Sequence, residues 1–403
     1  MMNNGEASGP LAGCRVLELG SLIAGPFCGQ LLGDFGAEII KIEDPARGDP
    51  MRQWGSQVPS GVSLTWPIIA RNKKSITCNL RDARGQELVR HLAARADVLV
   101  ENFRPGTLEK WDLGYDALSS LNPRLVMVRI TGYGQDGPYA QRAGFGSIGE
   151  AMGGIRHTTG NPDRPPSRTG ISLGDSLAGT FAAFGAVMAL LNRERSGRGQ
   201  VVDSAIYEAV LALMESLIPE WELADFRRGR TGSILPGVAP SNVYAAADGS
   251  EILIAANSDA TFTRLCDVME LPELATNPRY QTHQARGEHL EELDKLIGEW
   301  TVTRPSAELL DRLHEAGVPA GRIYTAADMV TDAHFKARNS IVRLLHRSLG
   351  EFPMQNVAPR LSATPGEVRS LGPDLGEHNE AIYGQLLGLS LEHRAQLVAD
   401  GVI

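Results

Sequence analysis

The sequence predicts an α/β protein built on a parallel sheet, and three observations support this fold class. Residues 15–19 and 38–43 are short apolar runs typical of buried strands. Between them lies a segment that opens at Pro26, a residue favoured in the first turn of a helix, and stops near Gly36. The same alternation of strand and helix patterns recurs further along the chain. Because parallel strands need a crossover of this kind, we expect a parallel sheet with helices on its faces.

The following segments continue the alternation. Residues 75–80 and 97–101 have strand patterns, with a helical pattern at 85–96 between them. Residues 125–131 form another strand pattern, after which 132–174 are rich in glycine and proline and predict a long loop. Long loops at the strand ends of α/β folds commonly carry the functional site.

The middle of the chain predicts a change of architecture. The apolar run at 177–191 indicates a helix buried on all sides, and 201–224 indicates one long helix. Residues 242–256 contain two strand patterns around an Asp248-Gly249 turn, followed by helical patterns at 260–316.

These patterns divide the chain into domains. We expect a large α/β domain over 10–224, a smaller domain over 225–325, and a C-terminal part, 326–403, that returns to the large domain with a strand at 341–345.

The composition narrows the class of protein. Hydrophobic residues make up 42% of the 403 residues and charged residues 22%, which is typical of a globular protein. The apolar runs fall short of the roughly 18–20 residues that span a bilayer, so no membrane partner is expected. The net charge of −9 argues against a nucleic-acid partner. The first residues lack a secretory signal pattern, which predicts a cytoplasmic protein.

The sequence also argues against a bound metal or dinucleotide. Cys14, Cys28, Cys78 and Cys266 are scattered without C-x-x-C spacing, which indicates buried thiols rather than zinc ligands or a disulfide framework. The glycines of the first strand–helix unit do not form G-x-G-x-x-G, so an NAD-dependent oxidoreductase is disfavoured. We expect no metal and no permanently bound cofactor.

Asp175 is the most informative residue, because it lies where a glycine-containing turn meets the apolar run at 177–191. One interpretation is a helix N-cap, the commoner use of aspartate at such a place. The other is a carboxylate nucleophile, whose pKa the positive end of the helix would lower. The local sequence leaves both open.

Two further segments have a structural and a functional interpretation. The basic run from Arg71 to Lys74 is either a solvated loop or a phosphate contact for a nucleotide-bearing ligand. The turn Glu101-Asn-Phe-Arg-Pro-Gly106 either ends a strand or covers a bound adenine or pantetheine group.

Several segments together resemble the family III CoA-transferases, from residue 11 to the C-terminus. They are RVLELGSLIAGP, GAEIIKIEDPARGDPMR, NKKSI, VENFRPG, GYGQDGP, the pair Gly174-Asp175, and LGEHN. In that family, the aspartate that follows a glycine at this point is the covalent nucleophile, and Asp175 matches it. The resemblance implies ping-pong transfer through aspartyl anhydrides and an aspartyl-CoA thioester, with CoA and acyl-CoA as substrates.

The resemblance also implies residues that contact CoA. The matching positions are Ile23, Ala24, Cys78, Leu80, Arg81, Asn102, Phe103, Arg104 and Lys110. Where the family has a basic residue, this chain has Asp44, so the phosphate contacts are expected to move to Arg47, Arg71 or Lys74. The segment from Gly232 to Gly237 matches the family's glycine-rich closing loop, although an ordinary interdomain turn is the alternative.

Two positions separate this chain from its relatives. The 2-methylacyl-CoA racemases of the same superfamily use a histidine as a second acid/base where this chain has Phe145. Racemisation needs two opposed proton-transfer groups, so a racemase or epimerase is the less favoured alternative. Formyl-CoA transferase has a glutamate that falls here on Gly146, which argues against a formyl or oxalate substrate.

The acceptor and the assembly follow from the same resemblance. The stretch before Asp175 resembles the subgroup that uses succinyl-CoA with malate, citramalate, mesaconate or benzylsuccinate. Candidates for binding the distal carboxylate of such a diacid are Arg156, His157, Arg164 and Arg168. The family fold is a large Rossmann-like domain built from both chain ends plus a smaller α+β domain, in an interlocked dimer. A homodimer is expected; a heteromer, or a non-catalytic partner subunit, is the alternative.

Overall fold

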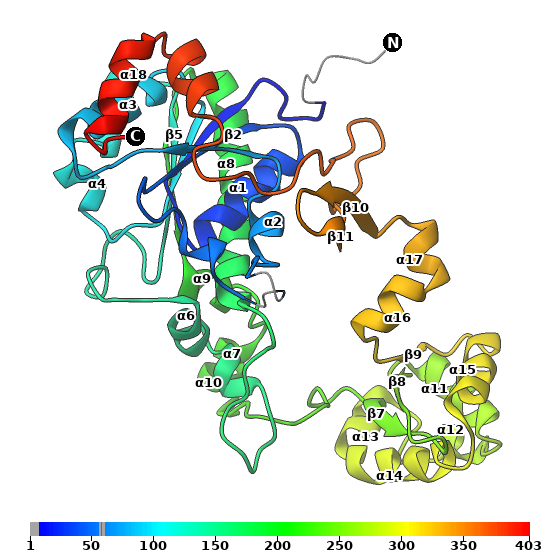
Figure 1. The fold of residues 1–403 in the computed structure, drawn as a ribbon. Coiled ribbons are helices and arrows are strands. Elements are labelled where there is room, and N and C mark those ends of the chain that lie inside the picture. The colour runs from blue at the N-terminus through cyan, green and yellow to red at the C-terminus, as the bar shows by residue number, and fades with distance from the viewer. Residues whose placement is uncertain (1–7, 56–57, 59–60) are drawn as a thin grey trace. The chain divides into compact units, whose positions relative to one another are not determined.

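The computed structural model describes residues 8–55, 58 and 61–403, and it divides into two compact units (Figure 1). The first unit holds the chain up to Ile155, together with Thr169–Ile218 and Lys336–Ile403; the second holds Arg156–Arg168 and Pro219–Phe335. The predicted boundaries therefore move to 219 and 335. Residues 156–168, which the sequence assigned to the large domain, belong to the second unit. Within it, Gly232 donates a backbone hydrogen bond of 2.9 Å to Gly160.

The first unit is built on a six-stranded sheet, which confirms the predicted α/β class. Its strands are β1 (Arg15–Glu18), β2 (Glu38–Glu43), β3 (Lys73–Thr77), β4 (Val98–Glu101), β5 (Val126–Thr131) and β6 (Val201–Ala205). All neighbours pair in parallel in the order β3-β2-β1-β4-β5-β6. The order reverses between β1 and β4, and ligands of doubly wound sheets bind beyond the carboxyl ends of the strands at such a reversal.

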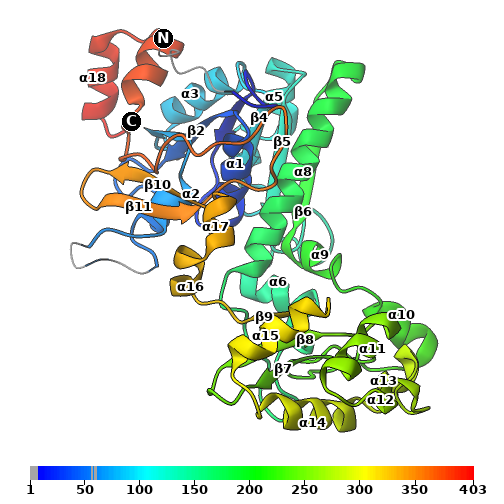
Figure 2. The same cartoon turned by 90° about the vertical axis from the view of Figure 1, so that its right-hand side faces the viewer.

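Consecutive strand residues face opposite sides of the sheet and enter two different cores. Val16 packs with helices α1 (Ala24–Asp34) and α8 (Leu173–Ser196), which Figure 2 shows along one face. Leu17 packs on the other face, where the core includes residues of α3 (Ala83–Ala93), α5 (Tyr115–Leu121), the π-helical segment η2 (Glu380–Leu386) and α18 (Leu391–Ala399). Because both faces are covered, the strands read as continuous apolar runs.

The C-terminal segment closes the edge of the sheet at β3. The Tyr383 hydroxyl donates to the Thr77 carbonyl at 2.7 Å, and the Thr77 amide donates to Asn379 Oδ1 at 2.9 Å. The hairpin β10 (Ile341–His346) and β11 (Gly350–Gln355) belongs to the same unit. The predicted strand at 341–345 is therefore confirmed, and residues 336–403 group with the first unit.

Helix α8 differs from the prediction of a helix buried on all sides. Ala178, Ala182, Ala186 and Ala189 are fully buried, whereas bulkier residues lie on an exposed face: Phe181, Phe184, Val187, Met188 and Leu191. The small side chains let the helix approach the sheet closely, so the bulky ones point outward. With 24 residues, α8 is also long and apolar enough to cross a membrane by length and composition, although 44% of its apolar window is buried inside the protein.

The predicted long helix at 201–224 is wrong. Residues 201–205 form strand β6, followed by α9 (Ile206–Leu211) and α10 (Leu217–Ala224). The pair Val201-Val202 is β-branched, and β6 completes its backbone hydrogen bonds against β5, a partner that a sequence pattern does not reveal.

Shorter helices connect these elements. They are η1 (Pro50–Arg52), α2 (Trp66–Ile69), α4 (Thr107–Lys110), α6 (Gly146–Met152), α7 (Ile155–Thr158), α16 (Ala326–Thr331) and α17 (Ala333–Ala337). Helices α6 and α7 interrupt the stretch that was predicted to be a long loop.

The second unit has a separate core. Its strands β7 (Ser241–Ala245), β8 (Glu251–Ala255) and β9 (Ala320–Arg322) pair antiparallel, with the predicted hairpin between the first two. The predicted run of helices is also confirmed: α11 (Asp259–Val268), α12 (Glu273–Thr276), α13 (His283–Glu288), α14 (Leu290–Thr301) and α15 (Ser306–Glu315). Arg286 of α13 is fully buried and donates to the carbonyls of Ala239 and Tyr280, each at 3.0 Å. These bonds tie α13 to the segment before β7 and to the segment after α12.

Candidate active site

A cleft of about 210 Å³ lies at the carboxyl edge of the first unit's sheet. Its walls come from segments that follow β1, β2, β3 and β4, the place where a doubly wound sheet binds its ligand. The lining residues are Leu19, Gly20, Ser21, Lys41, Ile42, Glu43, Asp44, Gly48, Asp49, Pro50, Cys78, Asn79, Leu80, Arg81, Phe103 and Trp111. The fold thus brings together Cys78, Leu80, Arg81 and Phe103, which the resemblance assigned to CoA.

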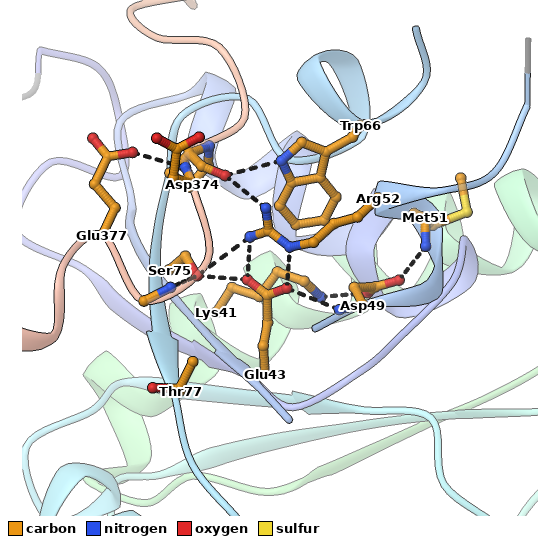
Figure 3. Close-up of polar contacts among 12 residues, drawn as sticks. Lys41, Glu43, Asp49, Met51, Arg52, Trp66, Ser75, Thr77, Asp374 and Glu377 are labelled. Carbon is orange, nitrogen blue, oxygen red and sulfur yellow. Dashed lines mark hydrogen bonds and ion pairs between the residues drawn. The ribbon is translucent and has the colours of Figure 1, made fainter. Parts of the chain in front are cut away.

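A buried ion cluster lies at the floor of this cleft. The ammonium of Lys41 is 2.8 Å from Asp49 (Figure 3). It also lies 3.0 Å from Glu18 and donates to the Gly20 carbonyl at 2.9 Å. Burial alone would lower the pKa of Lys41, but the charges of Glu18, Asp49 and Glu43 hold it above its usual value. Lys41 is therefore a fixed cation that joins β2 to the loop after β1.

A second ion pair lies beside Lys41. The Arg52 guanidinium approaches the carboxylate of Glu43 at 2.7 and 2.8 Å, and the Ser75 hydroxyl donates to the same carboxylate at 2.5 Å (Figure 3). Burial would raise the pKa of Glu43, but the Arg52 hydrogen bond and the charge of Lys41 lower it overall. Arg52 also lies 3.9 Å from the ring centroid of Trp66, which fixes the loop after β2.

The loop that leads into α1 is held from two sides. Asn102 accepts from the Ser21 amide at 2.9 Å and donates to the Ser21 carbonyl at 2.8 Å, while Asp49 accepts from the Leu22 amide at 3.2 Å. Leu22 has a φ of 66°, an uncommon conformation that these contacts stabilise. Asn102, predicted as a CoA contact, thus uses its amide to hold the loop that places Ile23 and Ala24 at the start of α1.

One wall of the cleft is aromatic. The rings of Phe103 and Trp111 meet edge to face with centroids 5.4 Å apart. The Phe103 amide donates to buried Glu101 at 2.7 Å, and Glu101 pairs with Arg129 at 2.6 Å. Burial raises the pKa of Glu101 in spite of Arg129. This wall therefore presents two aromatic side chains to the cleft.

Exposed basic residues lie on or next to the lining segments. Arg81 lines the cleft itself, while Arg47 precedes Gly48 and Arg104 follows Phe103. Lys110 precedes Trp111 in the same way. The thiol of Cys78 donates to the Gly85 carbonyl at 3.4 Å, and burial raises the pKa of this thiol to about 12.

Two predicted phosphate contacts lie elsewhere. Arg71 is 3% exposed and pairs with Asp34 through two hydrogen bonds of 3.0 and 2.5 Å. Lys74 pairs with Glu38 at 2.5 Å, at the amino end of β3, whereas Cys78 follows its carboxyl end. The fold does not bring Arg71 and Lys74 to the cleft, so we leave both out of the CoA site that we propose.

Asp175 is half-buried in the first turn of α8. The N-cap residue is Ser172, and Asp175 is the third residue of the helix, so the N-cap interpretation of Asp175 is wrong.

Helix α8 packs closely against α1. One turn after Asp175, Gly179 lets α8 approach α1 so closely that a β-carbon there would lie 2.7 Å from the Ala24 carbonyl oxygen. The helix that carries Asp175 therefore contacts the start of α1, directly after the loop that lines the cleft.

Helix α6 brings its first residue against the carboxylate of Asp175. A β-carbon built on Gly146 would lie 2.7 Å from the Asp175 Cγ and closer still to Oδ2. Phe145, the preceding residue, is 65% exposed. The absence of a side chain at Gly146 thus makes room for the carboxylate.

One residue of this site was missed by the sequence analysis. Glu150 is 1% exposed and accepts a hydrogen bond of 3.2 Å from the Gly174 amide, next to Asp175. An acid one helical turn after Gly146 was the signal that could have revealed it.

The remaining candidate residues belong to the second unit. Gly232 and Gly237 have φ values of 69° and 74°, which suits glycine, and Arg230 donates to the Asn161 carbonyl at 3.1 Å. Of the predicted diacid contacts, His157, Arg164 and Arg168 are exposed and Arg156 is half-buried.

The strand order defines a doubly wound α/β protein, and a cleft lies at the carboxyl edge of its sheet. The family model described as "CoA-transferase family III" matches residues 11–379 of this chain. The chain therefore belongs to this family and is a CoA-transferase. The resemblance found in the sequence is confirmed.

Relatives and a solved structure agree with this assignment. The chain is 61% identical to the succinyl-CoA–D-citramalate CoA-transferase of Chloroflexus aurantiacus, over 98% of both chains. It is 42% identical to the beta subunit of the succinyl-CoA–L-malate CoA-transferase of the same organism, again over 98% of both. A crystal structure of a CaiB/BaiF family protein from Brucella suis matches 94% of this chain and 100% of its own, with 36% identity and a TM-score of 0.81.

The contact between Gly146 and Asp175 yields a prediction. Gly146→Ala should lower kcat about 100-fold, because the added methyl group displaces the carboxylate and misplacement of about 1 Å costs this much. Steady-state kinetics measure the effect. Gly170→Ala, at a glycine with open space around it, is the control and should leave kcat unchanged. An unchanged kcat in Gly146→Ala would show that the carboxylate has another place to lie.

Proposed function

We propose that this enzyme transfers CoA from succinyl-CoA to D-citramalate or a closely similar C4–C5 dicarboxylate. The 61% identity to a succinyl-CoA–D-citramalate CoA-transferase supports both substrates. The observation that carries the mechanism is the half-buried carboxylate of Asp175 in the first turn of α8, against a glycine that leaves it room. The cytoplasm is the proposed location.

The proposed reaction proceeds by exchange of acyl groups on Asp175. Its carboxylate attacks the thioester carbonyl of succinyl-CoA, which gives a mixed anhydride and releases CoA as a thiolate. The thiolate attacks the aspartyl carbonyl, so succinate leaves and an aspartyl-CoA thioester remains. The acceptor carboxylate attacks this thioester and forms a second anhydride with release of CoA thiolate. Attack of the thiolate on the acceptor's acyl carbonyl yields the new thioester and restores Asp175.

The electrostatics of α8 suit these steps. The positive end of a helix stabilises the ionised nucleophile, and its backbone N–H groups can stabilise an oxyanion as it forms. Both intermediates react with water, so the site must close during turnover. We assign closure to the segment from Gly232 to Gly237 and the distal acceptor carboxylate to one of Arg156, His157, Arg164 and Arg168.

The cleft suits the adenosine end of CoA. Phe103 and Trp111 supply a surface for the base, while Arg81, with Arg47, Arg104 and Lys110 nearby, supplies charge for the phosphates. The loop that starts α1, with Ile23 and Ala24, leads from this cleft toward α8.

The proposed assembly is a homodimer. The exposed apolar face of α8, which includes Phe184 at 59% exposure and Leu191 at 63%, is a surface that a second copy would cover. A heteromer is the alternative, since one relative is the beta subunit of its enzyme. Activity of the purified chain alone distinguishes the two.

The nucleophile can be tested directly. Asp175→Ala should lower kcat at least about 1000-fold, because the covalent route is lost. Hydroxylamine added during turnover of the unaltered enzyme should form a hydroxamate on Asp175, which peptide mass spectrometry locates. Asp116→Ala, at an exposed aspartate of α5, is the control. Full activity of Asp175→Ala would exclude the mechanism.

The CoA cleft makes a separate prediction. Phe103→Ala and Arg81→Ala should each raise KM for succinyl-CoA about tenfold, since a stacking or charged contact contributes on the order of 1–2 kcal/mol. KM for the diacid should stay constant in the same initial-rate measurements. Arg84→Ala removes a nearby arginine that pairs with Asp82 and should change neither value. A change in the diacid KM alone would assign the cleft to the acceptor.

The dimer is tested on α8. Phe184→Glu places a charge on the exposed apolar face and should convert a two-chain particle into single chains, as sedimentation velocity would measure. Leu391→Glu, at a leucine of α18 that is 73% exposed, should leave the particle size unchanged. A single-chain particle for the unaltered protein would refute the proposal.

A further inference from the structure

We propose that Glu150 is a positioning residue, whose carboxylate acts as a hydrogen-bond acceptor that fixes the first turn of α8 and thereby the place of Asp175. This inference rests on the proposed function of Asp175. Glu150 lies in α6, is 1% exposed, and accepts the Gly174 amide hydrogen at 3.2 Å. It is thus a buried carboxylate bonded to the residue directly before the proposed nucleophile.

Glu150 caps α8 from another helix. The first N–H groups of a helix lack partners within it, and an N-cap side chain usually accepts one of them. Ser172, the N-cap residue of α8, makes no such side-chain hydrogen bond. Glu150 satisfies the amide of Gly174, the second residue of the helix, so the start of α8 depends on α6.

The same face of α6 meets Asp175. Gly146 and Glu150 are four residues apart and therefore share one face of the helix. Gly146 lies against the Asp175 carboxylate, and a β-carbon on Gly174 would lie 2.9 Å from the Gly146 carbonyl oxygen and 3.1 Å from the Glu150 Cγ. A change at Glu150 would therefore move the backbone directly before the nucleophile and the glycine that faces its carboxylate.

Close packing against α9 leaves α6 little freedom. A β-carbon on Gly153 would lie 2.6 Å from the Val210 Cβ, and one on Gly149 would lie 2.9 Å from the Ile206 Cβ. Helix α9 thus packs against α6, while the Glu150 hydrogen bond joins α6 to the start of α8. Across the interface between α6 and α8, the Gly174 amide donates its hydrogen bond to Glu150.

Burial separates the roles of the two carboxylates. Asp175 is half-buried, whereas Glu150 is enclosed and bonded to the backbone. Because Gly174 already donates to Glu150, its amide is committed and the oxyanion donors must come from other N–H groups. Glu150 is therefore a support for the nucleophile and not a second one.

Two conservative variants separate the hydrogen bond from the charge. Glu150→Gln keeps an acceptor oxygen at the same distance and removes the charge, whereas Glu150→Asp keeps the charge and withdraws the oxygen by one methylene group. Ile148→Val, on the exposed side of the same helix, is the control. Each enzyme is mixed with succinyl-CoA in a single turnover, quenched, and analysed by intact-protein mass spectrometry for the aspartyl-CoA adduct.

We expect Glu150→Asp to form the adduct 10- to 100-fold more slowly, with the KM for succinyl-CoA within threefold of that of the unaltered enzyme. Glu150→Gln and Ile148→Val should both form it within threefold of the normal rate. If Glu150→Gln is as slow as Glu150→Asp, or if Glu150→Asp keeps the normal rate, the positioning role is refuted. An adduct that also forms in Asp175→Ala would instead refute the proposed function, so the two failures are distinguishable.

Discussion

The buried ammonium of Lys41 is the interaction on which the carboxyl edge of the sheet depends. It binds Glu18 of β1 and Asp49 of the loop after β2, while the other oxygen of Glu18 lies 2.7 Å from Lys73 of β3. Three strands are thus joined by alternating buried charges. Loss of one partner from such a group typically costs about 3–5 kcal/mol, because the remaining charge stays buried without compensation. The network therefore fixes the loops around the cleft more strictly than apolar packing would.

Helix α8 has three features that rarely occur together in one helix. Its first turn holds an acid, its buried face uses alanine and Gly179 to approach the sheet and α1, and its exposed face is bulky and apolar. Small residues at the contact give the helix a fixed depth, so the height of Asp175 above the sheet is set by backbone contact. Long, flexible side chains at the same contact would leave that height less well defined.

The sequence predicted the parts of the molecule that depend on local pattern. Strand β2 matches the expected 38–43, and the motif around Gly174 and Asp175 located the nucleophile that we propose. The failures involve partners that are distant in sequence. Residues 201–205 became a strand because β5 lies beside them, and Arg71 left the expected site because Asp34 binds it inside the protein. Periodicity carries no information about either partner.

The closure of β3 by the C-terminal segment has a consequence for biosynthesis. The contact between Thr77 and Asn379 joins residues 302 positions apart, so it forms only after almost the whole chain has been synthesised. Until then β3 is an edge strand with unpaired amides, and such an edge can pair with other chains. Contacts of this separation also slow folding. The nascent first unit is therefore exposed to aggregation during translation of the second, and a stop codon before residue 379 would leave that edge open permanently.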